Sequence, residues 1–288
     1  MTFPAAWLTL LGLAEAVCVV ALWRFFVRGE RGQLLDTVAL EGNAIGQDRV
    51  DGLATTVLNA VSLASLAVAT IVVAVIALAR GRVLLTLVVT AFVATANVVT
   101  QVLKHGLYRP EFGIDPERAA AGNSFPSGHA TVAMSVVIAL VLVLPPRMRG
   151  VAAVVGAGYA AVAGIATMSL GWHRPSDVAG AMLVVGGCAA LAGLLLVLAQ
   201  GRDARVKSDD AHPLAVALLV ITSVVLVAVS AAAFWWTDGV ATTPVDEVGR
   251  RTLLTAYAGA AASIAGVTAG VTALTLAAVH RVVPWRTG

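Results

Sequence analysis

Apolar residues run through this chain in long blocks, and short polar stretches separate them. A helix that crosses the hydrocarbon core of a bilayer needs about 20 mostly apolar residues. The blocks reach that length and lack the alternation of barrel strands, so they favour helices. The pattern predicts eight membrane-spanning helices: Pro4–Phe26, Ala54–Ala79, Val83–Leu103, Gly128–Leu144, Val151–Leu170, Asp177–Ala199, Leu214–Trp236 and Thr252–Val279.

Composition supports the same fold class. Of the 288 residues, 59% are apolar and 12% are charged, and the mean hydropathy is +0.90, which excludes a soluble globular protein. The net charge of +3 is small and scattered along the chain, so the sequence does not indicate nucleic-acid binding. We predict an all-α polytopic membrane bundle, and the Ala-, Val- and Arg-rich composition suggests a bacterial plasma membrane.

Basic residues are concentrated in the segments that follow the second, fourth and sixth predicted spans. By the positive-inside rule, short loops rich in Lys and Arg lie in the cytoplasm. We therefore expect these segments and both chain termini to be cytoplasmic, and the intervening loops to face outward. The basic residues concerned are Arg80, Arg82, Arg147, Arg149, Arg202, Arg205 and Lys207.

The longest loop, Val27–Leu53, lies on the predicted outer side. Within it, Leu34–Ile45 alternates loosely between apolar and polar residues. This pattern predicts a short amphipathic segment that lies on the outer membrane surface.

Three polar stretches lie where predicted spans begin or end: Lys104–Pro110, Ser124–His129 and Gly171–Asp177. They come after an odd span, before an even span and after another odd span. All three therefore lie on the same membrane face, which is the outer face in the orientation given above. Ionisable groups are costly inside a membrane and usually have a function, so their occurrence together predicts an active site.

The first two stretches carry groups that bind phosphate. Lys104 and Arg109 supply positive charge, and an Arg can hold a phosphate with two parallel hydrogen bonds. Ser127 and Gly128 lie at the start of a predicted helix, where free N–H groups favour an anion. His129 can protonate a leaving oxygen. Taken one at a time, the two cations could instead be interfacial anchors, the Ser-Gly pair a helix start, and the histidine a packing residue.

The third stretch pairs an imidazole with a carboxylate. His173 and Asp177 are four residues apart, so they share a helix face if the sixth span begins near them. A carboxylate on one ring nitrogen fixes the tautomer and leaves the other nitrogen free to attack. The set therefore predicts phosphoryl transfer through a phosphohistidine, with no metal ion or other cofactor required.

These motifs, K…RP, PSGH and HxxxD in this order at the ends of successive spans, resemble the type 2 phosphatidic acid phosphatase (PAP2) superfamily. The resemblance implies that His173 is the nucleophile, Asp177 its orienting partner and His129 the general acid. It also implies that the phosphate is held by Lys104, Arg109, Ser127 and Gly128. We expect residues 1–199 to form a six-span catalytic core and residues 200–288 to add two further spans.

The chain departs from the family pattern at two places. Glu111-Phe112 stands where many members have a second Arg-Pro pair, and the spacing of Lys104 and Arg109 is shorter than usual. Ala166 and Thr167 stand where the third motif normally has Ser-Arg. One phosphate-binding arginine is thus absent, and Arg174, next to the nucleophile, is the candidate substitute.

The function expected from the resemblance is hydrolysis of a lipid phosphate, such as a polyprenyl phosphate or diphosphate or a phospholipid phosphate, at the outer face. Two alternatives stay open. The phosphohistidine could pass its phosphoryl group to an alcohol instead of water, or the protein could bind lipid phosphates without turnover. Apart from the lipid substrate and the membrane, no nucleic acid and no obligate protein partner is expected.

Overall fold

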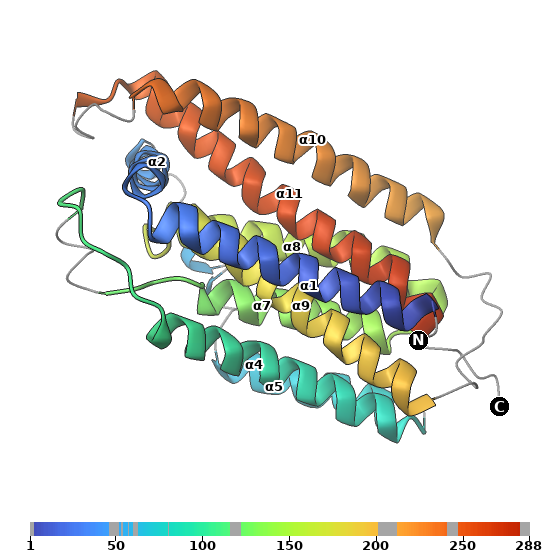
Figure 1. Ribbon diagram of the computed structural model, residues 1–288. Coiled ribbons are helices and arrows are strands. Elements are labelled where there is room, and N and C mark those ends of the chain that lie inside the picture. Colours follow the sequence, from blue (N-terminus) through green and yellow to red (C-terminus); the bar gives the residue numbers. More distant parts are fainter. Residues whose placement is uncertain are drawn as a thin grey trace.

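A computed structural model describes residues 3–45, 52, 54–56, 58–59, 63–79, 81–115, 122–200, 212–240 and 247–282. The regular elements of this described part are helices, and none of its residues lies in a strand (Figure 1). The helices are α1 (Phe3–Leu22) with its π-helical extension η1 (Trp23–Val27), α2 (Glu30–Glu41), η2 (Gly42–Ala44), α4 (Leu63–Leu78), α5 (Val83–Gly106), α7 (Gly128–Val143), α8 (Pro146–Ser169), α9 (Pro175–Gln200), α10 (Pro213–Thr237), η4 (Asp238–Val240) and α11 (Arg250–Val282).

The predicted fold class is confirmed: the chain is an all-α polytopic membrane bundle. Each of the eight predicted spans overlaps one long helix, namely α1, α4, α5, α7, α8, α9, α10 and α11. Six helices in the described residues are long and apolar enough to cross a bilayer. The helix α7 has 16 residues and is shorter than a full span.

The helix α8 begins earlier than the sequence pattern indicates. It starts at Pro146, directly after α7, so Arg147 and Arg149 belong to its first turn and not to a loop. The Arg149 side chain is buried and donates from Nε to the carbonyl of Leu144 at 3.0 Å, which satisfies a free carbonyl at the end of α7. Its charge caps a helix, so it is weaker evidence for a cytoplasmic loop than the sequence suggested.

The prediction of a surface segment at Leu34–Ile45 is wrong. The helix α2 covers most of it, and this helix is largely buried at one end of the bundle. Two glycines permit the burial. A side chain at Gly32 would collide with the carbonyl of Phe25 in η1, and a side chain at Gly42 would collide with the carbonyl of Leu253 in α11. The short helix is therefore packed tightly between η1 and α11.

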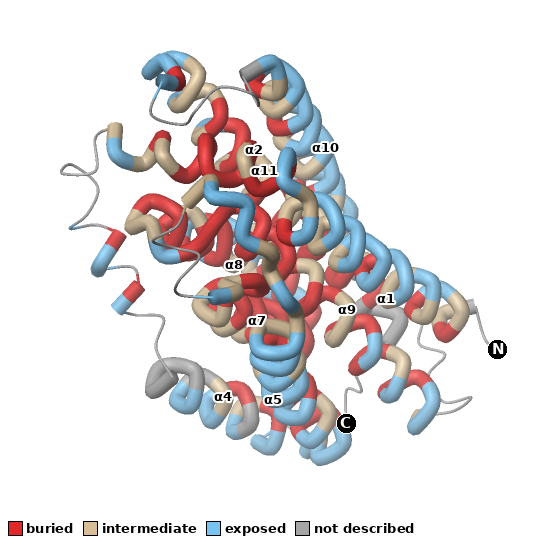
Figure 2. The backbone as a smooth tube through the Cα atoms, turned by 60° about the vertical axis from the view of Figure 1, so that its left-hand side comes forward, coloured by how far each residue is buried: buried red, intermediate tan, exposed pale blue. Residues whose placement is uncertain are grey.

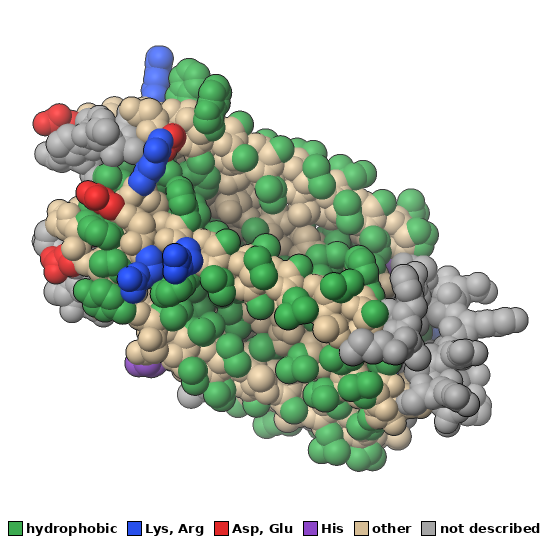
Figure 3. Space-filling view, viewed as in Figure 1, with side chains coloured by type: hydrophobic (Ala, Val, Ile, Leu, Met, Phe, Trp, Pro, Cys, Tyr) green, Lys and Arg blue, Asp and Glu red, His purple; other side chains and the backbone are tan. Residues whose placement is uncertain are grey.

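The interior of the bundle is formed mainly by α7, α9 and parts of α8 and α11, as the buried segments in Figure 2 show. The helix α10 packs along α11 and leaves most of its apolar side chains exposed, including Leu214, Trp235 and Trp236. In the space-filling view, apolar side chains cover the length of the helices, and charged side chains gather toward one end (Figure 3). Such an apolar belt is the surface that lipid covers.

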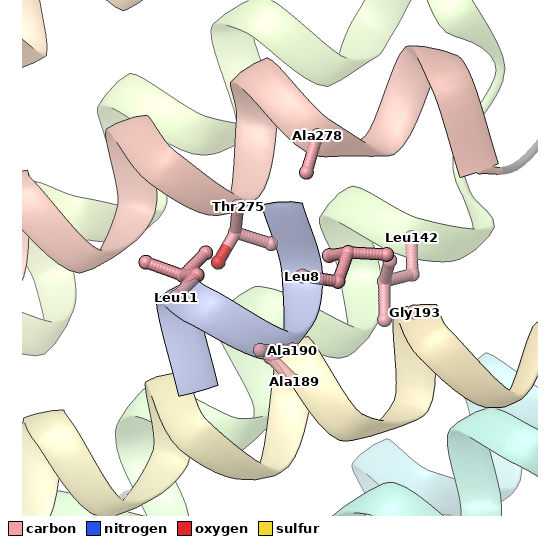
Figure 4. Close-up of a pocket in the computed structure, with 8 residues that line it drawn as sticks. All are labelled: Leu8, Leu11, Leu142, Ala189, Ala190, Gly193, Thr275 and Ala278. Atoms are coloured by element: carbon pink, nitrogen blue, oxygen red, sulfur yellow. The ribbon is translucent and has the colours of Figure 1, made fainter. Parts of the chain in front are cut away.

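The two ends of the bundle differ in character. The helix α2 and the loop that follows α5 lie at one end, whereas α1 begins and α11 ends at the other (Figure 1). Near that other end, α1, α7, α9 and α11 enclose a cavity of about 20 Å³ lined by apolar groups and the single hydroxyl of Thr275 (Figure 4). This small cavity is lined by no acid, base or cation.

Candidate active site

The three polar stretches come together at the α2 end of the bundle. The helix α5 ends there at Gly106, α7 begins there at Gly128, and α9 begins there at Pro175. Asn123 ties the second stretch to the first, because its Nδ2 donates to the carbonyl of Lys104 at 3.1 Å. The shared face predicted from the order of the spans is therefore a contiguous site.

Asp177 is the buried centre of this site. Its Oδ1 accepts a hydrogen bond from Nη2 of Arg109 at 3.0 Å, and its Oδ2 accepts from Oγ of Ser124 at 2.6 Å. The same Oδ2 accepts the backbone N–H of Arg174 at 3.0 Å, and the Asp177 carbonyl accepts the backbone N–H of Ser127 at 2.9 Å. One residue thus holds all three stretches in a fixed arrangement.

His173 and His129 face each other across the site. Their ring centroids are 6.3 Å apart, and the ring of Trp172 lies 5.3 Å from that of His129. Nδ1 of His173 lies 3.5 Å from Oδ2 of Asp177, an ion-pair distance that is longer than a standard hydrogen bond. This places a carboxylate on one nitrogen of His173 and leaves the other nitrogen for a different role.

The turn after α8 explains the position of His173. Gly171 has a φ of 68°, and the N–H groups of Gly171 and Trp172 bond to the carbonyls of Met168 and Thr167. This pattern is a Schellman motif, which requires a left-handed residue and therefore favours glycine. The N–H of His173 also bonds to the Thr167 carbonyl, at 3.3 Å. The end of α8 thus sets the backbone of His173 directly.

Two arginines with buried side chains contact Asp177, Arg109 through its guanidinium and Arg174 through its backbone N–H. Nε and Nη1 of Arg109, and Nε of Arg174, have no hydrogen-bond partner among the described residues. Nη2 of Arg174 lies 3.4 Å from Oδ2 of Asp115. Both arginines line a cavity of about 240 Å³ whose wall also contains Asn123 and Gln33. The site therefore offers several unused N–H donors, which an anion such as phosphate can accept.

The remaining predicted phosphate-binding residues border the same region. Ser127 is the N-cap of α7, and its Oγ accepts the N–H of Ala130 at 3.3 Å, so the hydroxyl hydrogen remains for another acceptor. Gly128 is the first residue of this helix and is half-buried. Lys104, in the last turn of α5, is a charged neighbour of His129. All eight residues predicted from the sequence thus belong to this one end of the bundle.

Residues 63–202 match the family model of the PAP2 superfamily. This segment is a PAP2 superfamily domain. No curated protein and no solved structure matches the chain.

The PAP2 domain comprises α4, α5, α7, α8 and α9 and contains all three polar stretches. The helices α1, α2, α10 and α11 lie outside the match. Two of them nevertheless contact the site region: α2 packs against α9, and the hydroxyl of Tyr257 in α11 lies 2.7 Å from Oγ of Ser169, at the end of α8. The helix α11 thus contacts the end of α8 directly before the turn that carries His173.

Several functional contacts were not predicted from the sequence. Ser124 and Asn123 lie within or beside a motif, but only the folded geometry shows them bonded to Asp177 and Lys104. Asp36 is fully buried, and it accepts hydrogen bonds from the backbone N–H of Ser176 at 3.1 Å and from its Oγ at 2.5 Å. No local signal in the sequence singled out Asp36, because its partner Ser176 is 140 residues away.

The environment of Asp36 changes its acidity. Burial raises the pKa of the Asp36 carboxyl to about 6, and the negative charge of Asp177 adds to the rise. The hydrogen bond from Ser176 and the positive charges of Arg109 and Arg174 oppose it. Asp36 therefore changes its charge only about one pH unit below neutrality.

Proposed function

We propose that this protein is a lipid-phosphate phosphohydrolase that works through a phosphohistidine intermediate at the outer membrane face. The observation that carries the proposal is the pair of facing imidazoles, His173 and His129, 6.3 Å apart between ring centroids. The carboxylate of Asp177 lies between His173 and Arg109, at 3.5 Å from Nδ1 of His173 and 3.0 Å from Nη2 of Arg109. Membership of the PAP2 superfamily supports phosphatase chemistry.

In the first half-reaction, the free ring nitrogen of His173 attacks the phosphorus atom. A P–N bond forms, the P–O bond to the lipid breaks, and protonated His129 gives its proton to the departing oxygen. Asp177 stabilises the positive charge that develops on the His173 ring. In the second half-reaction, neutral His129 takes a proton from water, the water oxygen attacks phosphorus, and the P–N bond breaks to release inorganic phosphate.

The negative charge on the phosphoryl oxygens requires fixed donors. Arg109 and Arg174 supply unused N–H groups, and Lys104 supplies a further cation near His129. Ser127 and the amino end of α7 complete the set. Positioned cations and a helix amino end can stabilise a phosphoryl group without a metal ion.

An amphiphilic substrate fits the surroundings of His129. Trp172 contacts this histidine and is half exposed at the edge of the bundle, where an aromatic ring suits the membrane interface. The leaving oxygen would lie at His129, so the lipid moiety would depart toward the membrane. Candidate substrates are polyprenyl phosphates, polyprenyl diphosphates and phospholipid phosphates.

Phosphate release by the purified protein in detergent tests the proposal. The panel contains phosphatidic acid, phosphatidylglycerol phosphate, a polyprenyl phosphate and a polyprenyl diphosphate, each assayed with and without an added alcohol. We expect free phosphate without the alcohol. Phosphate transfer that occurs only when the alcohol is present would indicate a transferase. Binding of the panel lipids with no release would indicate a protein that binds lipid phosphates without turnover.

A further inference from the structure

The helix α2 contacts two separate segments of the site with two side chains on one helical face. We call these segments the two arms of the site: one is the loop after α5, which carries Arg109, and the other is the start of α9 with the turn before it, which carries His173 and Asp177. Gln33 and Asp36 are three residues apart, so they lie on the same side of the helix. Gln33 donates from Nε2 to the carbonyl of Pro110 at 2.9 Å. Asp36 accepts both the N–H and the hydroxyl of Ser176. The helix thus bridges the loop after α5 and the first turn of α9, through two residues that are 66 positions apart in sequence (176 minus 110).

Each contact lies next to a residue of the proposed chemistry. Pro110 follows Arg109, whose guanidinium bonds to Asp177 and keeps two nitrogens unpartnered among the described residues. Ser176 precedes Asp177 and lies in the first turn of α9. A carboxylate that accepts a first-turn N–H satisfies a donor that has no partner within the helix. Its negative charge is also stabilised by the partial positive charge at the amino end of the helix.

The position of α2 is itself fixed. Gln33 also donates to the carbonyl of Val27 at 2.8 Å, and Gly32 and Gly42 allow contact with η1 and α11 that a side chain would prevent. The side chains of Gln33 and Asp36 are buried. These contacts make α2 a rigid support and not a surface segment that happens to touch the loops.

We infer that α2, a helix outside the PAP2 domain, positions both arms of the active site: Gln33 fixes the arm that carries Arg109, and Asp36 fixes the arm that carries His173 and Asp177. The two are positioning residues, because neither touches the reacting atoms. The inference rests on the proposed function. Its specific consequence is that the two side chains affect different steps, since one arm holds phosphate and the other arm attacks it.

Kinetics of three variants test the division. Asp36→Asn keeps the side-chain shape but loses the charge, Gln33→Met loses both donated bonds, and Glu30→Gln is the control because Glu30 is an exposed acid on the same helix. The substrate is the panel lipid that the wild type hydrolyses fastest. Inorganic phosphate serves as a competitive inhibitor that reports on phosphate binding alone.

We expect Asp36→Asn to lower kcat by about 10- to 100-fold, as misplacement of a reacting group does, with little change in KM or in phosphate inhibition. Gln33→Met should raise KM and the phosphate inhibition constant by about tenfold, because of its two lost bonds only the one to Pro110 holds the segment that carries Arg109. Glu30→Gln should match the wild type. Loss of folding alone would also lower the apparent kcat at unchanged KM, so each kcat is calculated per folded protein, with the folded fraction measured by thermal unfolding in detergent.

A second substitution keeps the test decisive if Asp36→Asn does not fold. Ser176→Ala removes the hydroxyl donor but keeps the N–H bond to Asp36, so a smaller fall in kcat at unchanged KM is expected. The inference is overturned if folded α2 variants and Ser176→Ala all keep kcat, KM and phosphate inhibition within about twofold of the wild type. An active wild type with such variants leaves the proposed function intact, whereas an inactive wild type overturns both.

Discussion

Arg174 offers a quantitative test of how this chain compensates for the arginine that the third family motif normally carries. The residue is buried, which excludes an interfacial anchor whose head group reaches water. Its Nε has no partner among the described residues, and it lines the same cavity as Arg109. Loss of one donor to a developing negative charge typically costs about 2.7–4 kcal/mol in transition-state stabilisation, or about 10²–10³-fold in rate. We therefore expect Arg174→Ala to lower kcat/KM by that factor.

The ion pair with Asp115 supplies the matched control. Nη2 of Arg174 lies 3.4 Å from the Asp115 carboxylate, so Asp115→Asn weakens the same pair from the other side and keeps the guanidinium. If Arg174 binds the phosphoryl group, Asp115→Asn should lower kcat/KM much less than Arg174→Ala, because the guanidinium stays in the cavity. The assay is phosphate release under subsaturating substrate, with thermal unfolding in detergent as the check on folding. Equal losses in the two variants, or a nearly active Arg174→Ala enzyme, would refute the assignment.

Three other properties can be tested on the purified protein or on cells. Activity should survive EDTA, since Arg109, Arg174 and the amino end of α7 can stabilise the phosphoryl charge; loss on chelation with recovery by a divalent ion would contradict the proposed chemistry. The orientation can be tested in a background without Cys18 and Cys188. Phe112→Cys, at the α2 end, should react with an impermeant thiol reagent outside intact cells, whereas Met148→Cys, at the other end, should react only after lysis. The opposite result would reverse the orientation. Because the pKa of Asp36 is raised to about 6, the folded protein keeps a proton between about pH 4 and 6 that the unfolded chain has lost. The thermal unfolding midpoint in detergent should therefore fall as pH rises through this window. The fall should be smaller in Asp36→Asn, which has no carboxyl to titrate at this position.

The spans and the motif residues could be predicted from the sequence because their signals are local. A run of about 20 apolar residues predicts a span without knowledge of its neighbours. The order of Lys104, His129 and His173 relative to successive spans was enough to place them on one face. The fold then follows from the requirement that backbone groups in lipid are satisfied within each helix.

The buried role of α2 could not be predicted in this way. Its alternation of polar and apolar residues fits both a membrane surface and a packed helix, and only the close contacts at Gly32 and Gly42 decide between them. Likewise, Asp36 and Ser176 are 140 residues apart, so no local pattern links them. The early start of α8 was missed for a related reason, since Arg149 looks like a loop charge until its bond to the Leu144 carbonyl is known.

The most direct test of the account is whether phosphate becomes attached to His173 during turnover. Wild-type protein is mixed with a radiolabelled panel lipid phosphate and quenched in alkali, where a phosphohistidine survives, and the labelled peptide is identified. We expect label on the peptide that contains His173, and no label and no phosphate release in His173→Ala. Phosphate release by His173→Ala at a rate close to that of the wild type would contradict the account.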